Sequence, residues 1–365
     1  MKVTIINSFD VYDRRVELLR GALRGEGHRV SVLIPNFRHV QKCVRTHCPE
    51  GFEMLPASPY YGKFSPARIR SHVRFSKAAL ARARSLAPDL LWVLAPPNSL
   101  VREAALYKRQ RPEMKLVLDI MDLWPESMPV PGFSQTPFGR VWRDLRDRYV
   151  DAADTVVTER SQYWAALQKR CGREKLHTLF VPRDPGFRYL EDHPPPDRIA
   201  LCFLGQVNED VDLQAVGGLI RGLDRPVELH VIGDGPQEAQ LRRAAEDSGA
   251  SVVFHGRVYA PEEKWKIFDR CHAGLNLLKN GTRSGLTMKS VDYLEASLPL
   301  INNVGGDTWS FLEQHPVGLN YDESVHMTAA KLLALQSRRE QIQAIYRTYF
   351  AESVFSANLQ KIMRS

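Results

Sequence analysis

Several patterns that mark membrane-spanning and catalytic proteins are missing from this sequence. None of its apolar runs reaches about 18 residues, so no membrane-spanning helix is predicted. It contains neither the G-x-S-x-G of serine hydrolases nor a P-loop, and its 11 histidines show no metal-ligand spacing. The first expected strand is not followed by G-x-G-x-x-G, so a dinucleotide fingerprint is not supported either. These absences argue against a serine hydrolase, a P-loop enzyme and a histidine-bound metal.

Cysteine is scarce as well. The five cysteines are odd in number and include no C-x-x-C, which is unlike a disulfide framework or a redox motif. They fit a reducing compartment, in which most cysteines are small buried apolar residues. We therefore expect a cytoplasmic protein.

Charge is unevenly distributed along the chain. Residues 1–180 hold 30 Lys and Arg against 18 Asp and Glu, a net charge of +12, whereas residues 181–365 carry −4. A basic first half indicates an anionic partner for that half. No nucleic-acid-binding module is recognisable, and a membrane surface or a lipid phosphate is at least as good a candidate.

Apolar strand-like segments alternate with helical segments along both halves of the chain. This alternation predicts an α/β fold with parallel, doubly wound sheets. The five prolines of residues 182–198 mark a boundary between the halves. We expect a first Rossmann-like domain at residues 1–181, a linker at 182–198, a second Rossmann-like domain at 199–345, and a C-terminal helix at 346–365.

Residues 63–84 contain seven Lys or Arg and no acidic residue. After Pro66, Ile69, Val73 and Leu80 recur at helical spacing, which predicts a helix with one apolar stripe and a basic remainder. This composition is typical of a helix on an anionic membrane surface, although a solvated helix that covers the sheet fits equally well. Two further basic residues lie near the start of the first helix. The membrane or acceptor hypothesis assigns contacts to Arg14, Arg15, Arg70, Arg74 and Lys77.

Residues 281–306 form the stretch best suited to binding an anion. A loop with glycines and Arg283 precedes a helix that we expect to start near residues 286–289 and to run through Leu294. A helix N-terminus carries N–H groups without helical partners and roughly half a positive charge, which suits a phosphate. An ordinary connection between a helix and a strand is the alternative.

The second half also carries an ordered set of short motifs. They are GQV at 205–207, HVIGDGP at 230–236, VFHGRV at 253–258, and K-x-x-D-Y-L followed by LP at 289–299. The set resembles the second domain of GT-B glycosyltransferases, and most closely the family-4-type (group 1) enzymes that build bacterial surface polysaccharides. DLWPES at 122–127 and YRTYFAESVF at 346–355 also resemble that group. The resemblance implies two Rossmann-like domains facing a cleft, with a C-terminal helix that crosses back to the first domain.

The resemblance also implies roles for individual residues. Asp292 stands where the family has a glutamate that binds the donor ribose, and Gly205 is the glycine of close approach after the first strand of the domain. The loop at Arg257 and Val258 is the one that usually touches the nucleotide base. The implied donor site comprises Gly205, Gln206, Arg257, Val258, Lys279, Ser284, Gly285, Leu286, Thr287 and Asp292.

The sequence departs from the family at four further positions. The first glutamate of the family is Ser284 here, and the Arg and Lys that usually clamp the diphosphate are Gln206 and Val211. Met121 replaces the histidine that often precedes the cleft aspartate, Asp122. Another cation is therefore needed for the leaving diphosphate. The catalytic candidates are Arg283 first, then Lys289, with Asp122 at the acceptor; a solvated loop charge at Arg283 and a capping role for Asp122 are the alternatives.

The resemblance predicts transfer of a sugar from a nucleotide-sugar to a lipid-linked, polyprenyl-linked or polysaccharide acceptor. UDP-sugars are the first expectation for the donor and GDP-sugars the second. The resemblance implies retention of configuration, and no cofactor or metal is expected. The missing clamp residues leave two alternatives open, namely a nucleotide-sugar-binding partner of low activity and an epimerase of the same fold. We expect the protein at the inner face of the plasma membrane, as a peripheral protein.

Overall fold

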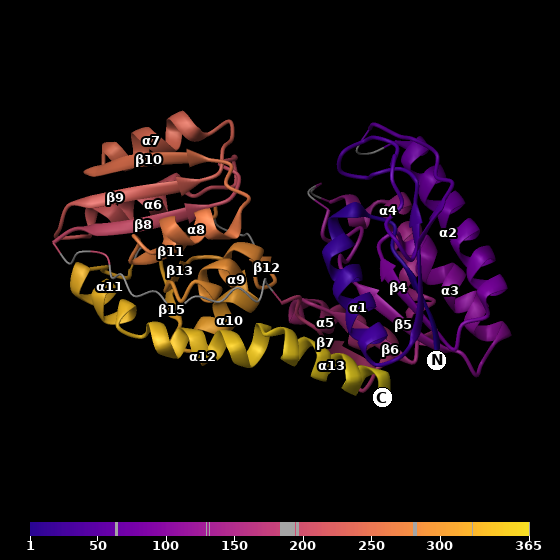
Figure 1. Ribbon diagram of the computed structural model, residues 1–365. Coiled ribbons are helices and arrows are strands. Elements are labelled where there is room, and N and C mark those ends of the chain that lie inside the picture. The colour runs from indigo at the N-terminus through magenta and orange to yellow at the C-terminus, as the bar shows by residue number, and fades with distance from the viewer. Residues whose placement is uncertain are drawn as a thin grey trace. The chain divides into compact units, whose positions relative to one another are not determined.

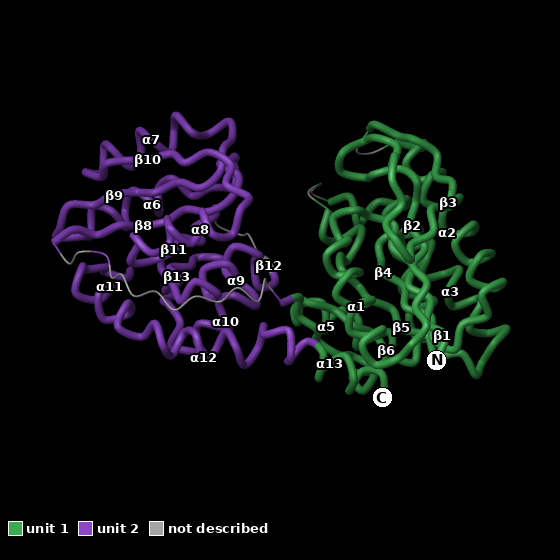
Figure 2. The backbone as a smooth tube through the Cα atoms, in the orientation of Figure 1, with its two compact units in different colours: residues 1–181, 356–365 green, residues 182–355 purple. Residues whose placement is uncertain are grey.

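The computed structural model describes residues 1–62, 65–128, 130, 132–182, 194, 197–279, 283–322 and 324–364, except for the side chains of Arg283 and Ser284. The chain divides into two compact units (Figure 2). The first unit comprises Met1–Val181 and Ser356–Ser365, and the second comprises Pro182–Phe355. Each unit has its own parallel sheet and its own apolar core.

A seven-stranded parallel sheet forms the centre of the first unit (Figure 1). Its strand order is β3-β2-β1-β4-β5-β6-β7. The strands are β1 (Lys2–Ile6), β2 (Arg29–Pro35), β3 (Phe52–Leu55), β4 (Leu90–Ala95), β5 (Lys115–Ile120), β6 (Thr155–Thr158) and β7 (Leu176–Thr178). The connecting helices are α1 (Asp13–Gly25), α2 (Pro66–Leu86), α3 (Asn98–Gln110), α4 (Pro137–Asp147) and α5 (Trp164–Cys171).

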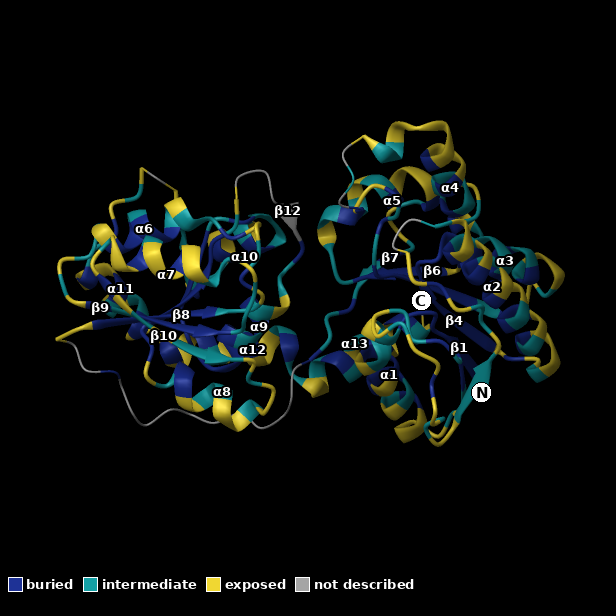
Figure 3. Ribbon diagram, turned by 90° about the horizontal axis from the view of Figure 1, so that it is seen from above, coloured by how far each residue is buried: buried dark blue, intermediate teal, exposed yellow. Residues whose placement is uncertain are grey.

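The central strands of this sheet are apolar on both faces because the connecting helices cover both faces. β4, with the sequence LLWVLA, is buried at every position. α2 begins after Ser65, whose side chain accepts a hydrogen bond from the Arg68 N–H, and it buries Phe75 and Leu80 against the core. Figure 3 shows buried strands inside each unit and exposed residues on the outer faces of the helices.

The second unit repeats this architecture with a six-stranded parallel sheet in the order β10-β9-β8-β11-β13-β15. Its strands are β8 (Ile199–Leu204), β9 (Val227–Ile232), β10 (Ala250–Gly256), β11 (Ala273–Asn276), β13 (Leu300–Asn302) and β15 (Gly318–Asn320). A two-residue pairing joins β12 (Arg283–Ser284) to β14 (Gly305–Gly306). The helices between them are α6 (Leu213–Arg221), α7 (Glu238–Glu246), α8 (Pro261–Phe268), α9 (Met288–Glu295) and α10 (Asp307–Gln314).

Three helices end the chain: α11 (Ala329–Gln336), α12 (Arg339–Phe350) and α13 (Glu352–Arg364). α12 belongs to the second unit, in which Phe350 lies 6.0 Å from the ring of Phe311 on α10. The chain returns to the first unit from Ser356 onward. There the Lys115 ammonium of β5 donates hydrogen bonds to the carbonyl oxygens of Ile362 and Met363, at 3.0 and 2.9 Å. These bonds use carbonyl groups of the last helical turn, which have no partner within a helix.

The first strand of each sheet lies between the second and the fourth strands of that sheet in chain order. In the first unit β1 is flanked by β2 and β4, and in the second unit β8 is flanked by β9 and β11. At such a point the connections leave the sheet in opposite directions and open a crevice at the carboxyl ends of the strands, where α/β proteins bind ligands. Each sheet therefore has a candidate ligand-binding edge at the carboxyl ends of these strands.

Candidate active site

The loops after β8, β9 and β10 lie in direct backbone contact at the carboxyl edge of the second sheet. The Gly205 N–H donates to the Ile232 carbonyl at 2.9 Å, and the Gly233 N–H donates to the Gly256 carbonyl at 2.7 Å. A Cβ on Gly233 would lie 2.0 Å from the Gly205 carbonyl oxygen, so only glycine permits this approach. Gly205 itself has a φ of +123°, and no atom lies within 4 Å of the place where its Cβ would be, so its backbone is open to a ligand.

Arg257 and Val258 follow β10 on the third of these loops. The Arg257 guanidinium is exposed and pairs with Asp234 of the second loop, with Nε 2.7 Å from Oδ2. This exposed pair adds little stability because water screens it. The pair links the second loop to the loop that the resemblance assigns to the nucleotide base, which also contains the half-buried Val258.

The start of α9 lies at the end of the segment that contains β12. Thr287 caps the helix, because its Oγ1 accepts a hydrogen bond from the Ser290 N–H at 3.2 Å. The preceding Gly285 is buried, and its carbonyl accepts from the Thr308 hydroxyl at 3.3 Å. The helix predicted from residues 286–294 is thus confirmed, with bounds Met288–Glu295. Its first N–H groups supply the partial positive charge of a helix N-terminus.

Lys289 lies in the first turn of α9 and brings a full positive charge to this edge. Its ammonium is 4.9 Å from the ring centroid of Phe203, near the carboxyl end of β8. Burial lowers the pKa of Lys289 to about 8. An anion beside this ammonium would stabilise its charged form and so offset the loss of water. Lys289 is therefore a suitable contact for a diphosphate.

Asp292 lies three residues after Lys289 and is half-buried. Residues three apart share one side of a helix, so Asp292 and Lys289 project from the same side of α9. A carboxylate accepts two O–H bonds, as a ribose diol requires. One side of α9 therefore offers both a cation and a hydroxyl acceptor.

Tyr293 anchors α9 to the sheet at the point where β8 and β11 part. Its hydroxyl accepts from the Leu204 N–H at 2.7 Å and lies 3.1 Å from the Cys202 carbonyl oxygen, to which it can donate. The ring packs over Gly274, where a Cβ would meet it at 2.5 Å. This contact sets the distance between α9 and the two strands, and through them the position of Lys289.

A row of asparagines crosses the same edge and was not anticipated from the sequence. Asn276, Asn302 and Asn320 end β11, β13 and β15 and lie in register. The Asn276 side-chain N–H donates a hydrogen bond to the Asn302 Oδ1 at 2.7 Å, and the Asn302 side-chain N–H donates to the Asn320 Oδ1 at 2.9 Å. The Asn276 amide also lies 3.5 Å from the Ser290 hydroxyl of α9. The row ties the first turn of α9 to the strand ends.

Gln206 and Val211, which replace the cations of the family's diphosphate clamp, differ in burial. Gln206 is exposed after β8, whereas Val211 is buried and forms a bridge to Leu278. Lys279 is exposed, and its backbone N–H donates to the Asp210 carbonyl at 2.8 Å. The side chains of Arg283 and Ser284 lie outside the described part of the chain; only their backbone is described, paired with Gly305–Gly306.

In the first unit, Asp122 follows β5 and is held by two tyrosines. Tyr12 donates to its Oδ2 at 2.7 Å, and the Tyr163 hydroxyl lies 3.5 Å from Oδ1. Arg160 lies 3.7 Å from Oδ1 and donates to the Tyr163 hydroxyl at 2.7 Å. Burial and the Asp122 charge raise the pKa of Tyr12, so Tyr12 stays a proton donor. The carboxylate is 29% exposed and can reach a further hydroxyl.

The prediction that Arg15 contacts a membrane or an acceptor is wrong, because Arg15 is a buried structural cation. Its guanidinium binds both carboxylate oxygens of Asp119, at 2.7 and 2.9 Å, and also binds Glu159 at 2.9 Å. The side chain is 2% exposed. A buried guanidinium needs such partners, so the fold of the first unit uses this charge. Arg14 beside it is exposed.

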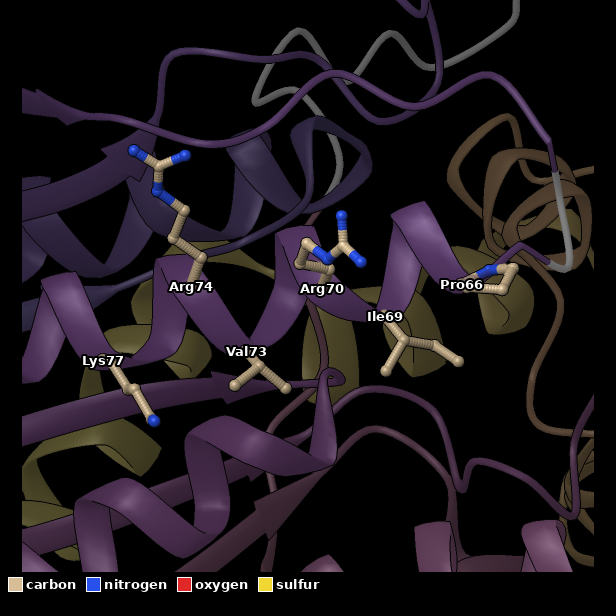
Figure 4. Close-up of a pocket in the computed structure, with 6 residues that line it drawn as sticks. All are labelled: Pro66, Ile69, Arg70, Val73, Arg74 and Lys77. Carbon is tan, nitrogen blue, oxygen red and sulfur yellow. The ribbon is translucent and has the colours of Figure 1, made fainter.

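Arg70, Arg74 and Lys77 lie on the exposed side of α2. They line an open hollow of about 520 Å³ together with Pro66, Ile69 and Val73. Figure 4 shows Ile69 and Val73 side by side along the helix, with Arg70 and Arg74 on its other edge. An apolar strip is thus flanked by cations, while Phe75 and Leu80 face the core.

An aromatic cluster at the carboxyl edge of the first sheet was missed by the sequence analysis. We define it as Phe9, Tyr12, His39, His72 and Trp124, which come from four segments of the chain. Because its members are up to 115 residues apart (Phe9 to Trp124), no local pattern could have joined them. Trp124 belongs to DLWPES, which is the one signal that could have pointed there.

No group of three or more His, Cys, Asp or Glu in the described part is placed to hold a metal ion. Across the same residues, no helix has the length and apolar character needed to cross a bilayer. The expectation of metal-independent transfer stays a prediction.

No protein-family model and no curated protein matches the sequence. Solved structures do match. The apo form of the lipopolysaccharide outer core galactosyltransferase WaaB gives a TM-score of 0.69 at 12% identity, covering 100% of this chain and 99% of its own. Anabaena Alr3699/HepE in complex with UDP and glucose gives 0.66 at 14% identity, covering 100% and 99%. Sucrose-phosphate synthase from Thermosynechococcus elongatus gives 0.68 at 12% identity, covering 100% and 98%. With two Rossmann-like units and full-length matches to GT-B glycosyltransferases, the chain has the GT-B fold.

Proposed function

We propose that this protein is a glycosyltransferase that takes a sugar from a nucleoside-diphosphate sugar. The observation that carries the proposal is the start of α9, where Lys289 and Asp292 share one side of a helix at the carboxyl ends of β8 and β11. The fold supports the same conclusion, since the matching structures include glycosyltransferases such as the galactosyltransferase WaaB. HepE was solved with UDP and with UDP-glucose, which favours uridine as the donor base.

In this proposal the donor lies across the edge of the second sheet. Asp292 accepts hydrogen bonds from the ribose hydroxyls, and the loop at Arg257 and Val258 contacts the base. The backbone N–H groups after Gly285 bind the diphosphate. Lys289 takes the place of the cations missing at Gln206 and Val211. Arg283, whose loop leads into the helix, is the second candidate for that role.

Charge on the diphosphate increases as the bond to the sugar breaks. The preorganised N–H groups and the Lys289 ammonium stabilise that charge more in the transition state than in the bound donor, which is the condition for faster transfer. We therefore propose transfer without a metal ion. Asp122, held by Tyr12 and Tyr163, orients the acceptor hydroxyl in the first unit. Retention of configuration and a role in bacterial surface glycan synthesis belong to the same proposal.

The acceptor is proposed to be a glycan or a polyprenyl-linked sugar at the inner face of the plasma membrane. The exposed Arg70, Arg74 and Lys77 beside Ile69 and Val73 support binding to an anionic membrane surface. Ionic attraction would hold this surface to the lipid headgroups, with the apolar strip at the interface.

Incubation with a panel of UDP-, GDP- and dTDP-sugars tests the reaction. We expect slow release of free sugar and nucleoside diphosphate from one donor. Arg283→Ala and Lys289→Ala should each lower this rate more than they weaken nucleotide binding, and the larger loss identifies the principal cation. A donor that is bound but never cleaved, even with added membrane lipid, would favour a nucleotide-sugar-binding partner. This second candidate rests on the exposed Gln206 and the buried Val211.

A further inference from the structure

The aromatic cluster of the first unit surrounds Phe9, which follows β1. The Phe9 ring centroid lies 4.2 Å from that of His39, 5.3 Å from that of His72 and 5.5 Å from that of Trp124. Phe9 and His72 are buried, whereas Tyr12, His39 and Trp124 are half-buried. Part of each half-buried residue is therefore open to solvent, and we call the exposed parts of Tyr12, His39 and Trp124 the aromatic face.

The Asp122 carboxylate lies next to this aromatic face, in contact with Tyr12. The Tyr12 ring lies 6.2 Å from Phe9, and the Tyr12 hydroxyl donates to Asp122 at 2.7 Å. Trp124 is two residues beyond Asp122 on the same loop. A molecule that reaches Asp122 therefore also meets the rings.

The Trp124 position is fixed by side chains from two helices. Its carbonyl oxygen accepts hydrogen bonds from the Asn98 amide at 2.9 Å and from Arg146 at 2.8 Å. The ring also packs edge-on against Trp142, at 5.8 Å. A ring held this firmly loses little conformational entropy on binding, which is what a recognition surface requires.

Two cations lie against the cluster, of which Arg68 is buried and Lys42 is half-buried. The Lys42 ammonium is 4.3 Å from the Tyr60 ring centroid, and the Arg68 guanidinium is 4.7 Å from that of Trp124. Lys42 adopts a φ of +54°, in the left-handed region that lysine rarely occupies. The Tyr60 hydroxyl is hydrogen-bonded to His39 and lies 3.4 Å from the His72 ring nitrogen Nε2.

Burial, and after it two neighbouring cations, make both histidines of the cluster less basic, whereas Asp10 acts in the opposite direction on the pKa of His39. Burial, then Arg68 and Lys42, lower the pKa of His39 to about 4, and the pKa of His72 is lowered in the same direction by burial and Arg68. Both imidazoles are therefore neutral near pH 7 and can donate and accept hydrogen bonds. Neutral rings beside two cations suit a polar ligand that carries negative charge.

We propose that the aromatic cluster, with the half-buried Lys42 and the buried Arg68 beside it, binds an acceptor sugar that carries an anionic group. The C–H face of the sugar ring packs on Trp124 and Tyr12, its hydroxyls meet His39 and Asp122, and its carboxylate or phosphate lies near Lys42. This inference rests on the proposed function and specifies its acceptor. The hollow behind Phe9 and His72 is only about 20 Å³, so the sugar packs on the outer face of the rings.

Binding of simple sugars to the full-length protein tests the inference without any turnover. The probes are methyl glucoside, which is neutral, methyl glucuronide, which carries a carboxylate, and glucose 6-phosphate. Saturation-transfer NMR titrations should give at least threefold tighter binding for one anionic probe than for methyl glucoside. The tighter of the two identifies the anionic group as a carboxylate or a phosphate.

Lys42→Met removes the charge and keeps the length of the side chain, so it should abolish the preference for the anionic probe. Trp124→Ala should abolish binding of all three probes. Lys169→Met, at an exposed lysine of α5, is the matched control and should bind as the wild type does. Equal binding of neutral and anionic probes, or an unchanged preference in Lys42→Met, overturns the anionic acceptor. Unchanged sugar binding in Trp124→Ala overturns the site itself.

UDP binding measured on the same preparations separates this inference from the proposed function. Sugar binding that depends on Trp124 without any binding of UDP or GDP would reject the nucleotide-sugar donor and leave the sugar site in place. Nucleotide binding without sugar binding would reject only the sugar site.

Discussion

The Lys289 ammonium lies over the Phe203 ring, and burial lowers its pKa to about 8. The group is thus protonated for most of the time at neutral pH but is poorly solvated. In the proposed site a bound diphosphate stabilises the charged form, so we expect the pKa of Lys289 to rise when the nucleotide binds. Nucleotide binding and protonation are therefore coupled.

The coupling predicts how affinity depends on pH. Below pH 8 Lys289 already carries its proton, so UDP binds with full affinity; above pH 8 binding must also take up a proton, so affinity falls as pH rises. Between pH 7 and pH 9 we expect a loss of about five- to tenfold in calorimetry, relative to Lys289→Met at the same two pH values. The variant corrects for ionisation of the ligand. Parallel pH profiles of the two proteins would contradict the coupling.

The same lowered pKa predicts an effect on stability with the opposite sign. The unfolded chain keeps the ordinary pKa of 10.5, so between pH 8 and 10.5 it binds more protons than the folded protein, and folding gains stability as pH rises. Lys289→Met should therefore be more stable than the wild type at pH 7, by about 1 to 3 kcal/mol, since one pKa unit is worth about 1.4 kcal/mol. Urea denaturation measures this difference, and a less stable variant would show that the charge is not desolvated.

Single residues also mark where inference from sequence ends. The helix start near Gly285 and Thr287 was predicted from a local pattern, and the resemblance assigned these residues and Asp292 to the donor site. Arg15 was misassigned because its partner Asp119 is 104 residues away and nothing local reveals the pair. Trp124 was noticed only as part of a motif, since its neighbours come from distant segments.

At the scale of elements, α9 depends on one tyrosine for its position. The Tyr293 hydroxyl accepts from the Leu204 N–H where the pairing of β8 with β11 ends at Phe203 and Leu275. Sequence alone predicted the helix and the strands but not this bond, because strand divergence appears only once the order of the sheet is known.

Tyr293→Phe tests this anchor. Removing the hydroxyl leaves the Leu204 N–H without its acceptor, which should cost about 1 to 3 kcal/mol of unfolding free energy. UDP affinity should fall as well, because the start of α9 is no longer fixed. Tyr61→Phe, at a tyrosine that is 73% exposed, is the control and should change neither quantity. Wild-type stability in Tyr293→Phe would mean that the hydroxyl does not position the helix.

α2 predicts a salt-dependent interaction with membranes. Each cation near an anionic surface adds about 1 kcal/mol, over a Debye length of about 8 Å at physiological salt. Sedimentation with vesicles that contain phosphatidylserine should therefore be strong at low salt and weaken as salt rises. Replacing Arg70, Arg74 and Lys77 by Gln should abolish it, whereas the same replacement of the exposed Arg24, Arg29 and Lys169 should not. Equal sedimentation of the two triple variants would mean that the cations of α2 are only solvated and do not bind the membrane.

At the scale of the whole molecule, the chain uses one architecture twice. Both sheets carry the first strand between the second and the fourth strands in chain order, and both place candidate site residues at the carboxyl edge created there. The alternation of apolar strands and helices was sufficient to predict this fold. The charge difference between the halves supports separate partners, an anionic acceptor or membrane for the first and a nucleotide-sugar for the second.

The central claim is that the start of α9 binds the nucleotide of a sugar donor. Calorimetric titration of UDP, with GDP as comparison, into the wild type, Asp292→Ala and the control Asp247→Ala tests it most directly. We predict that the wild type and Asp247→Ala, which alters an exposed residue after α7, bind UDP equally. Asp292→Ala should bind more weakly by about 1.5 to 3 kcal/mol, the range for hydrogen bonds to a charged group. Equal affinity of Asp292→Ala and the wild type, or no binding of either nucleotide, would contradict the claim.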